Sequence, residues 1–261
     1  MKIGIIQICS VLDYEQNLDK IRALLHEAKL RQLTRVFLPE CFYSMPDGTT
    51  PGPYLIDADN QDDEHYRNIR RLATDYAISI LGGSAPTKKG AAIVNRSYNF
   101  DKYGNDLGHY DKMHLFSCEL GSKIIDESNL YTPGTTPAMI RDQGLKIGLS
   151  ICFDLRYPCL YQDYAKNGAD ILSIPAAFTI PTGRAHWHTL IRARAIENQC
   201  FVVAPAQWGQ NNDKIETFGH SLIVDPWGEI LADAEEGEKL MSADIDLGKI
   251  ASVRKAIKST G

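Results

Sequence analysis

Residues 145–174 read LKIGLSICFDLRYPCLYQDYAKNGADILSI, and the order of apolar and polar segments in them indicates the fold class. The apolar run over 145–151 predicts a buried strand, which Cys152 ends. A proline then begins a helical segment over about 158–167, and residues 170–174 predict a second buried strand. The order of strand, helix and strand is typical of an α/β protein.

The same rhythm of Val- and Ile-rich runs and amphipathic segments extends along the chain. It lacks an internal repeat of 20–50 residues and a linker that would divide it, so we expect one domain over 1–261. Strands are expected near 2–9, 35–38, 77–83, 93–103, 106–110, 138–141, 200–204, 219–224, 229–233 and 240–245, helices near 16–33, 62–77 and 184–198, and a loop over 126–136.

Composition excludes several classes of function. The chain has 261 residues, 44% of them hydrophobic and 23% charged, which is ordinary for a globular protein. Its formal net charge of −5 argues against nucleic acid or an anionic membrane as the main partner. The sequence also shows no signal peptide and no apolar run long enough to span a membrane. We therefore expect a cytoplasmic protein that acts on a small molecule.

The cysteines are expected to be reduced thiols in the cytoplasm rather than a disulfide framework. No Cys-x-x-Cys pair occurs, and neither a metal site nor a cofactor is expected. Cys159 lies seven residues beyond Cys152, so a regulatory disulfide between them is an alternative, although the helix after Pro158 should carry Cys159 away. The six cysteines are Cys9, Cys41, Cys118, Cys152, Cys159 and Cys200.

Three reactive side chains follow three predicted strands. Glu40 comes just after the strand at 35–38, Lys112 follows the strand at 106–110, and Cys152 ends the strand described above. Ligands of open α/β sheets collect outside the carboxyl ends of strands, so the three side chains could meet in one pocket. A thiol needs a nearby base and positive charge to become a nucleophile, and a carboxylate with an ammonium supplies both.

These residues belong to segments that resemble, in order and spacing, the Glu, Lys and Cys motifs of the nitrilase superfamily of carbon–nitrogen hydrolases. The resemblance covers essentially the whole chain. It implies a four-layer α-β-β-α sandwich, assembled as a homodimer or a higher homo-oligomer. The segments are 38–40 (LPE), 110–116 (YDKMHLF) and 150–158 (SICFDLRYP), supported by 175–183, 185–187, 192–199 and 219–228.

The resemblance also implies catalytic roles. Glu40 would accept the thiol proton, protonate the leaving nitrogen and later activate the water that cleaves a thioester. Lys112 and the backbone N–H of Phe153 would form the oxyanion hole. Glu127 is similar to the family's fourth polar residue, which orients the others, and Glu119 is the alternative for that role.

The substrate-binding residues are less specific. Arg156 either pairs with a neighbouring acid such as Asp154 or grips a substrate carboxylate as a bidentate fork. Tyr43, Thr179 and Thr182 are expected as pocket walls by analogy with related amidases, with packing behind the pocket as the alternative.

The segments around Thr182 and Trp187 resemble the branch that contains deaminated glutathione amidase and omega-amidase. The first hypothesis is therefore an amidase for a small carboxylate-bearing amide, such as a deaminated glutathione-like compound or the omega-amide of a 2-oxo acid. An N-carbamoyl amino acid or carbamoyl-polyamine hydrolase is the enzymatic alternative, because the same residues would serve a ureido carbonyl. A catalytically inactive scaffold or binding protein is the alternative from another class.

Overall fold

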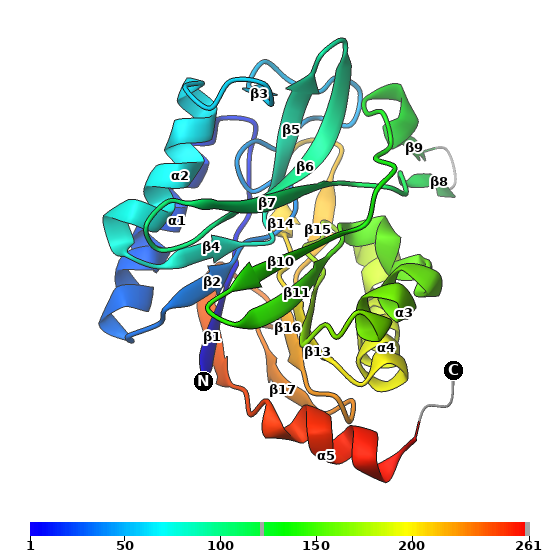
Figure 1. The fold of residues 1–261 in the computed structure, drawn as a ribbon. Helices are drawn as coiled ribbons and strands as arrows, with labels where there is room; N and C mark the ends of the chain where they lie inside the picture. The colour runs from blue at the N-terminus through cyan, green and yellow to red at the C-terminus, as the bar shows by residue number, and fades with distance from the viewer. Residues whose placement is uncertain (121–122, 259–261) are drawn as a thin grey trace.

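The computed structural model describes residues 1–120 and 123–258, which build two β-sheets packed face to face (Figure 1). The first sheet has the order β18-β1-β2-β4-β6-β5-β3, with β7 beside β6. Its central strands β1, β2 and β4 are parallel, and β18 pairs antiparallel with β1. The strands are β1 (Lys2–Gln7), β2 (Arg35–Phe37), β3 (Ile56–Asp57), β4 (Ser79–Leu81), β5 (Ser84–Lys89), β6 (Ala92–Phe100), β7 (Asp106–Asp111) and β18 (Lys239–Asp244).

The second sheet has the order β10-β11-β12-β13-β16-β17. Strands β11, β12 and β13 are parallel, and the outer pairs are antiparallel. The strands are β10 (Ala138–Asp142), β11 (Leu145–Leu149), β12 (Ile171–Ser173), β13 (Phe201–Ala204), β16 (Leu222–Val224) and β17 (Ile230–Asp233), and two small hairpins join β8 (Ser117–Leu120) to β9 (Lys123–Asp126) and β14 (Trp208–Gln210) to β15 (Glu216–Phe218).

Helices cover the outer face of each sheet (Figure 1). The helices α1 (Tyr14–Leu30) and α2 (Glu64–Tyr76) lie on the first sheet, and α3 (Pro158–Lys166) and α4 (Ile180–Asn198) lie on the second. The helix α5 (Gly248–Ala256) follows β18, and two 3-10 helices, η1 (Glu127–Asn129) and η2 (Cys152–Arg156), lie in loops. The predicted four-layer α-β-β-α sandwich is thereby confirmed. None of the helices described here has the length and apolar character needed to cross a membrane.

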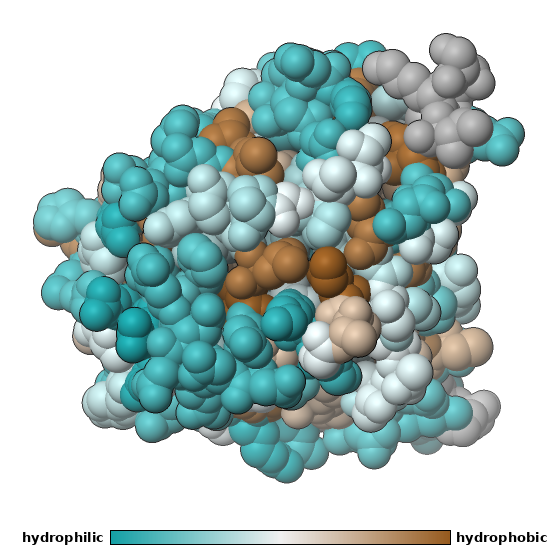
Figure 2. Space-filling view, turned by 90° about the horizontal axis from the view of Figure 1, so that it is seen from above, coloured by the Kyte–Doolittle hydropathy of each residue, from teal (hydrophilic) through white to brown (hydrophobic). Residues whose placement is uncertain are grey.

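The alternation of side chains along the strands explains why both sheets are apolar on both faces. In β1, Ile5 faces the second sheet whereas Ile6 faces α1 and α2, and both are fully buried. Leu18, Ile21 and Leu25 of α1 share one helical face. They pack with Ile6 in the hydrophobic core between the first sheet and its two helices. At the end of the molecule seen from above, hydrophobic residues gather near the middle and hydrophilic residues surround them (Figure 2).

Several predicted boundaries shift. The helix α4 begins at Ile180 rather than near 184, because Pro181 fits the first helical turn and Gly183 lets the helix lie against Phe218. The loop expected over 126–136 begins with the last residue of β9 and the 3-10 helix η1. The sequence did not indicate β5, the two small hairpins or α5, whose short segments lack a clear apolar period.

A buried ion pair joins the two sheets. The Arg35 guanidinium in β2 donates from Nε to Oδ2 of Asp142 at the end of β10, over 2.8 Å. The Ser79 hydroxyl in β4 donates to the other carboxylate oxygen over 3.0 Å. Both charged side chains are almost fully buried, so removal of either one leaves an uncompensated charge between the sheets.

We predict that Asp142→Ala lowers the free energy of unfolding by about 3–5 kcal/mol, because the Arg35 cation stays buried without its partner. Asp19→Ala is the matched control: it removes the exposed partner of Arg22 and should cost less than about 1 kcal/mol. Urea denaturation of both variants measures the difference. Equal losses in the two variants would contradict a structural role for the buried pair.

Candidate active site

Glu40 lies just beyond β2, after Pro39, and its side chain is almost fully buried. Its Oε1 accepts hydrogen bonds from the Asn95 amide in β6 and from the Lys112 ammonium, each over 2.9 Å. The side-chain amide of Gln207 donates to the Glu40 backbone carbonyl over 2.9 Å. The carboxylate is therefore held in place where the ends of several strands meet.

Lys112 follows β7 and places its ammonium between two carboxylates. Its Nζ is 2.9 Å from Glu40 Oε1, and 3.0 and 2.7 Å from the two carboxylate oxygens of Glu127. Glu127 begins η1, and the Phe116 N–H donates to its Oε2 over 2.7 Å. Glu119, the other candidate for this position, is exposed on β8. Of the two, Glu127 is the one that contacts Lys112.

Burial changes the proton affinities in this group. Burial alone would lower the pKa of Lys112, but Glu127 and Glu40 outweigh it and raise that pKa well above its ordinary value. Burial raises the pKa of the Glu127 carboxyl despite the nearby ammonium. Burial, and then the negative charge of Glu40, also raises the pKa of the Cys152 thiol well above its ordinary value. The two carboxylates thus favour the charged form of Lys112, whereas burial favours the neutral form of the Cys152 thiol.

Cys152 begins η2, three residues beyond the end of β11, and is buried. Its φ of 50° lies in the left-handed region, which is uncommon for a residue with a side chain and often marks a functional turn. The Cys152 N–H donates to the Pro175 carbonyl over 2.8 Å. The N–H of Phe153 belongs to the first turn of η2, where N–H groups have no partner within the helix. Cys159 is exposed on α3, and all six cysteines are free thiols.

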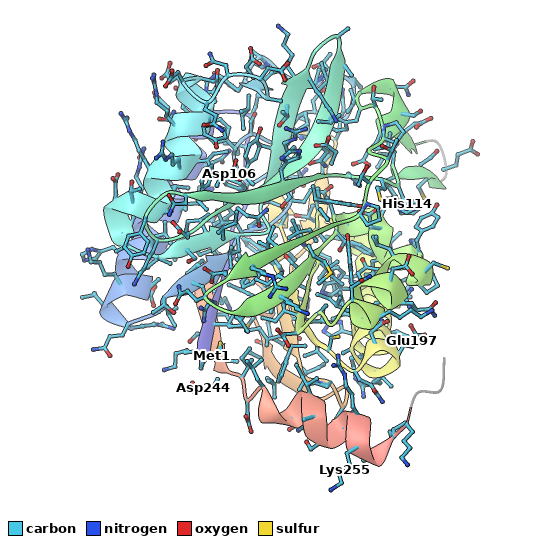
Figure 3. All side chains as sticks on the ribbon, viewed as in Figure 1. Met1, Asp106, His114, Glu197, Asp244 and Lys255 are labelled. Atoms are coloured by element: carbon cyan, nitrogen blue, oxygen red, sulfur yellow. The ribbon has the colours of Figure 1, made fainter. Side chains whose placement is uncertain are left out.

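Asp154 ties the cysteine turn to the segment that carries the lysine. Its Oδ2 accepts hydrogen bonds from the Ile151 N–H and from the Tyr110 hydroxyl in β7, each over 2.8 Å. Its Oδ1 lies 2.7 Å from Nδ1 of His114, a residue labelled in Figure 3 beyond the end of β7. The His114 ring stacks on Tyr157 at 3.5 Å between centroids. Asp154 therefore bridges the two loops that hold the reactive groups.

A partly enclosed cavity lies over these residues. Glu40, Glu127 and Cys152 line it, and its volume is about 80 Å³. Most of its wall is apolar, which suits a small acyl group rather than a long polar chain. The apolar wall includes Met45, Pro46, Phe116, Ile125, Leu130, Ala177, Phe178 and Ile215.

Arg156 is the cation in the described part of the cavity lining. It does not pair with Asp154, whose oxygens have other partners, but its Nη2 lies 3.1 Å from Nδ1 of His186. The guanidinium carbon lies 5.7 and 5.8 Å from the ring centroids of Phe153 and Phe178. A cation that contacts an imidazole nitrogen and aromatic rings, and no carboxylate of the described residues, keeps its charge available for an anionic ligand.

Of the three other residues predicted in the cavity wall, two line the cavity and one does not. Thr179 and Thr182 line the cavity, and their hydroxyls lie 2.9 Å apart. Tyr43 does not line it, contrary to the prediction: its ring stacks on Tyr14 of α1, and its hydroxyl lies 2.7 Å from Nδ1 of His65 in α2. Because the ring and the hydroxyl both have partners in the helical layer, Tyr43 belongs to the core behind the site.

Three further residues of the site escaped the sequence reasoning. Asn95 binds Glu40, Asp154 bridges the two loops, and the buried side chain of Tyr131 lines the cavity. Nothing in the sequence around Asn95 or Tyr131 distinguishes them from packing residues. For Asp154 the sequence signal is its position two residues beyond the candidate nucleophile, where an acid can accept backbone N–H groups and hold the turn. Such hydrogen bonds explain why a carboxylate is buried there.

Comparison with known proteins places the chain in a family. The family model described as carbon-nitrogen hydrolase matches residues 2–255. The nitrilase and fragile histidine triad fusion protein NitFhit of Caenorhabditis elegans is 38% identical over 258 residues, which are 97% of this chain and 58% of that protein. The chain thus spans less than two thirds of that relative.

Two other relatives match along most of their length. Mouse omega-amidase NIT2 is 35% identical over 98% of this chain and 92% of its own. The crystal structure of Saccharomyces cerevisiae Nit3, a member of branch 10 of the nitrilase superfamily, superposes with a TM-score of 0.89 at 30% identity, over 100% of this chain and 95% of that one. The chain belongs to the carbon-nitrogen hydrolase family of the nitrilase superfamily and is an enzyme of that family.

Proposed function

We propose that the enzyme is an amidase that hydrolyses a small carboxylate-bearing amide through a thioester on Cys152. The observation that carries this proposal is the buried Lys112 ammonium, which contacts both Glu40 and Glu127. These two carboxylates line one cavity together with Cys152. A base, a fixed positive charge and a thiol are the groups that acyl transfer to sulfur requires. The similarity to omega-amidase NIT2 supports an amide as the substrate.

In the proposed acylation, the sulfur of Cys152 attacks the amide carbonyl while its proton passes to Glu40. The carbonyl oxygen becomes an oxyanion, which the Phe153 N–H and the Lys112 ammonium stabilise. Because Lys112 meets both oxygens of Glu127, one of its hydrogens can turn to the oxyanion while Glu127 keeps the other contact. Glu40 then gives its proton to the leaving nitrogen, the C–N bond breaks, and an amine or ammonia departs.

Deacylation reverses the roles of the same groups. Water enters the position of the leaving nitrogen and loses a proton to Glu40 as it attacks the thioester carbonyl. The Phe153 N–H and Lys112 again hold the oxyanion. The C–S bond breaks, the sulfur recovers the proton from Glu40, and a carboxylic acid is released. Glu127 orients Lys112 throughout and exchanges no proton with the substrate.

Arg156 is the proposed recognition residue for a carboxylate on the acyl group. It offers a charged fork at the cavity wall, and no carboxylate of the protein neutralises it among the ion pairs of the described residues. The space is small and mainly apolar, so the acyl chain between the amide and the carboxylate should be short. A deaminated glutathione-like compound or the omega-amide of a 2-oxo acid meets these requirements.

The same groups would also hydrolyse an N-carbamoyl amino acid, whose ureido carbonyl is attacked in the same way and whose carboxylate would suit Arg156. A carbamoyl-polyamine fits less well, because its cationic chain would meet a guanidinium. An inactive scaffold would have no need to bury Lys112 between two carboxylates, since such burial is costly.

We also propose a homodimer or a higher homo-oligomer. Three large apolar side chains, Ile196, Trp227 and Ile230, are exposed near one another, where the end of α4 meets the β16–β17 turn. Exposed aromatic and aliphatic groups of this kind are typical of subunit contacts.

In a reducing cytoplasm, the compartment expected from the sequence, the thiol of Cys152 would remain free for catalysis.

Replacement of Cys152 by alanine should abolish amidase activity. We expect ammonia or amine release from a panel of omega-amides, deaminated peptides and N-carbamoyl compounds to fall by at least about a thousandfold, because no other group can carry the acyl intermediate. Cys159→Ala is the matched control and should retain activity, since that thiol is exposed on α3. Wild type and Cys152→Ala that are equally inactive across the panel would favour the scaffold alternative.

Arg156→Ala should separate acidic from neutral substrates. For amides with a free carboxylate we expect kcat/KM to fall about tenfold to a hundredfold, the value of a charge-assisted hydrogen-bond pair. For neutral amides of equal length the change should be less than about threefold, because the catalytic groups are untouched. Steady-state kinetics on matched amides measures both. Equal losses for the two classes would remove Arg156 from substrate recognition.

A further inference from the structure

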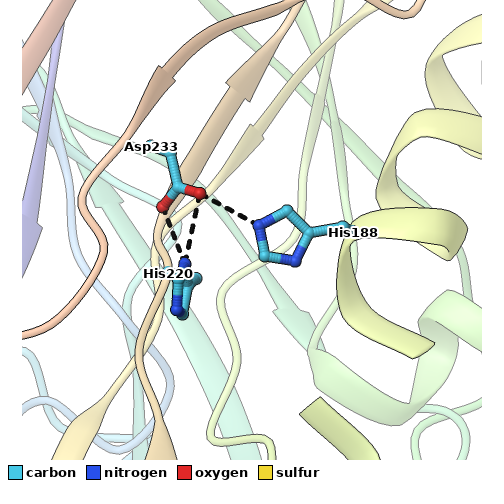
Figure 4. A group of neighbouring side chains, drawn as sticks. All are labelled: His188, His220 and Asp233. Atoms are coloured by element: carbon cyan, nitrogen blue, oxygen red, sulfur yellow. Dashed lines mark hydrogen bonds and ion pairs between the residues drawn. The ribbon is translucent and has the colours of Figure 1, made fainter. Parts of the chain in front are cut away.

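Three side chains that commonly bind metals meet outside the catalytic cavity, where α4 approaches the end of β17. His188 comes from α4, His220 from the β15–β16 loop, and Asp233 from the last position of β17, between the two imidazoles (Figure 4). Asp233 Oδ2 lies 3.0 Å from His188 Nε2 and 3.1 Å from His220 Nδ1. All three ligand atoms lie within 4.8 Å of one another.

The surroundings hold these groups in place. The His220 ring stacks on Phe218 at 4.5 Å between centroids, and the His188 ring meets the His220 ring nearly edge-on at 5.0 Å. The Glu235 N–H donates to Asp233 Oδ1 over 2.7 Å, which fixes the carboxylate. His220 also has a left-handed φ of 55°, uncommon for a residue with a side chain. Outer partners of this kind orient metal ligands in known sites.

The ligand atoms are spaced for a small ion. Tetrahedral bonds of about 2.0–2.2 Å place neighbouring ligand atoms about 3.3–3.6 Å apart. The carboxylate oxygen would withdraw from each imidazole by a few tenths of an ångström, and the two imidazole nitrogens, which lie within 4.8 Å of each other, would take up the same spacing. Each side chain is one quarter to one third exposed, which gives an ion and its water an entry path.

The donor types also suit a transition-metal cation. Two imidazoles and one carboxylate form a donor set that zinc and related ions favour over magnesium or calcium.

We propose that His188, His220 and Asp233 bind one divalent transition-metal ion of the zinc class, with water completing its coordination. The residues lie 45 and 13 positions apart from Asp233 in the sequence, so no local motif marks the site. The ion would clamp α4 to β17. The clamp would also reach the catalytic cavity, because Trp187 donates to the His220 carbonyl and packs on Phe178 in the cavity wall.

Equilibrium dialysis of the purified protein against Zn²⁺, with the bound metal quantified, tests this proposal. Wild type should bind about one equivalent, and both His188→Gln and Asp233→Asn should lower the affinity at least about tenfold, since even outer partners of metal ligands contribute that much. His26→Gln, which removes an exposed histidine of α1, is the matched control and should bind as wild type does. Thermal unfolding should show a zinc-dependent rise of Tm in wild type and His26→Gln alone.

The six thiols are the competing ligands, and Co²⁺ distinguishes them. A site of two imidazoles and one carboxylate gives visible absorption bands without the intense near-ultraviolet band of a cobalt–thiolate bond. Absence of binding to wild type would overturn the proposal and leave the cluster as a hydrogen-bonded group. Undiminished affinity in either variant, or a thiolate band that accounts for the bound Co²⁺, would overturn it as well.

Discussion

The catalytic end of the molecule depends on the buried ammonium of Lys112. Without it, Glu40 and Glu127 would face each other as two buried carboxylates, and one of them would have to take up a proton or move apart. Burying these charges costs free energy that only close mutual contacts can offset. The contacts also join the end of β2, the end of β7 and the loop after β9, so the position of the base and the position of the cation are set together.

The arrangement bears on how the proposed nucleophile is activated. Burial and the charge of Glu40 raise the pKa of the Cys152 thiol, which disfavours a standing thiolate–cation pair before substrate binds. Proton transfer to Glu40 would instead accompany attack on the carbonyl, when the negative charge passes from sulfur to an oxygen held by Lys112 and Phe153. Such a thiol should be poorly reactive towards general alkylating agents and selective for substrates that fit the cavity.

The fold class and the three reactive residues could be predicted from the sequence because each depends on residues that are neighbours along the chain. The strand before Cys152 and the proline that begins α3 have local signatures that indicated an α/β protein, and the resemblance of the motifs around Glu40, Lys112 and Cys152 to the nitrilase superfamily indicated the sandwich. The contact of Asn95 with Glu40 had no such local signature, because it joins elements 55 residues apart. The sequence could single out Asp154 but not its partner Tyr110, which lies 44 residues away. Tyr43 was misplaced since an aromatic residue near a catalytic motif can face either the cavity or the core.

Mass spectrometry of the enzyme quenched with acid during turnover of an omega-amide tests directly whether Cys152 carries the acyl group. A thioester mechanism predicts a mass increase equal to the acyl group on the peptide that contains Cys152, lost again on treatment with hydroxylamine. Turnover with the acyl group on a different residue, or with no covalent adduct when deacylation is slowed, would contradict it.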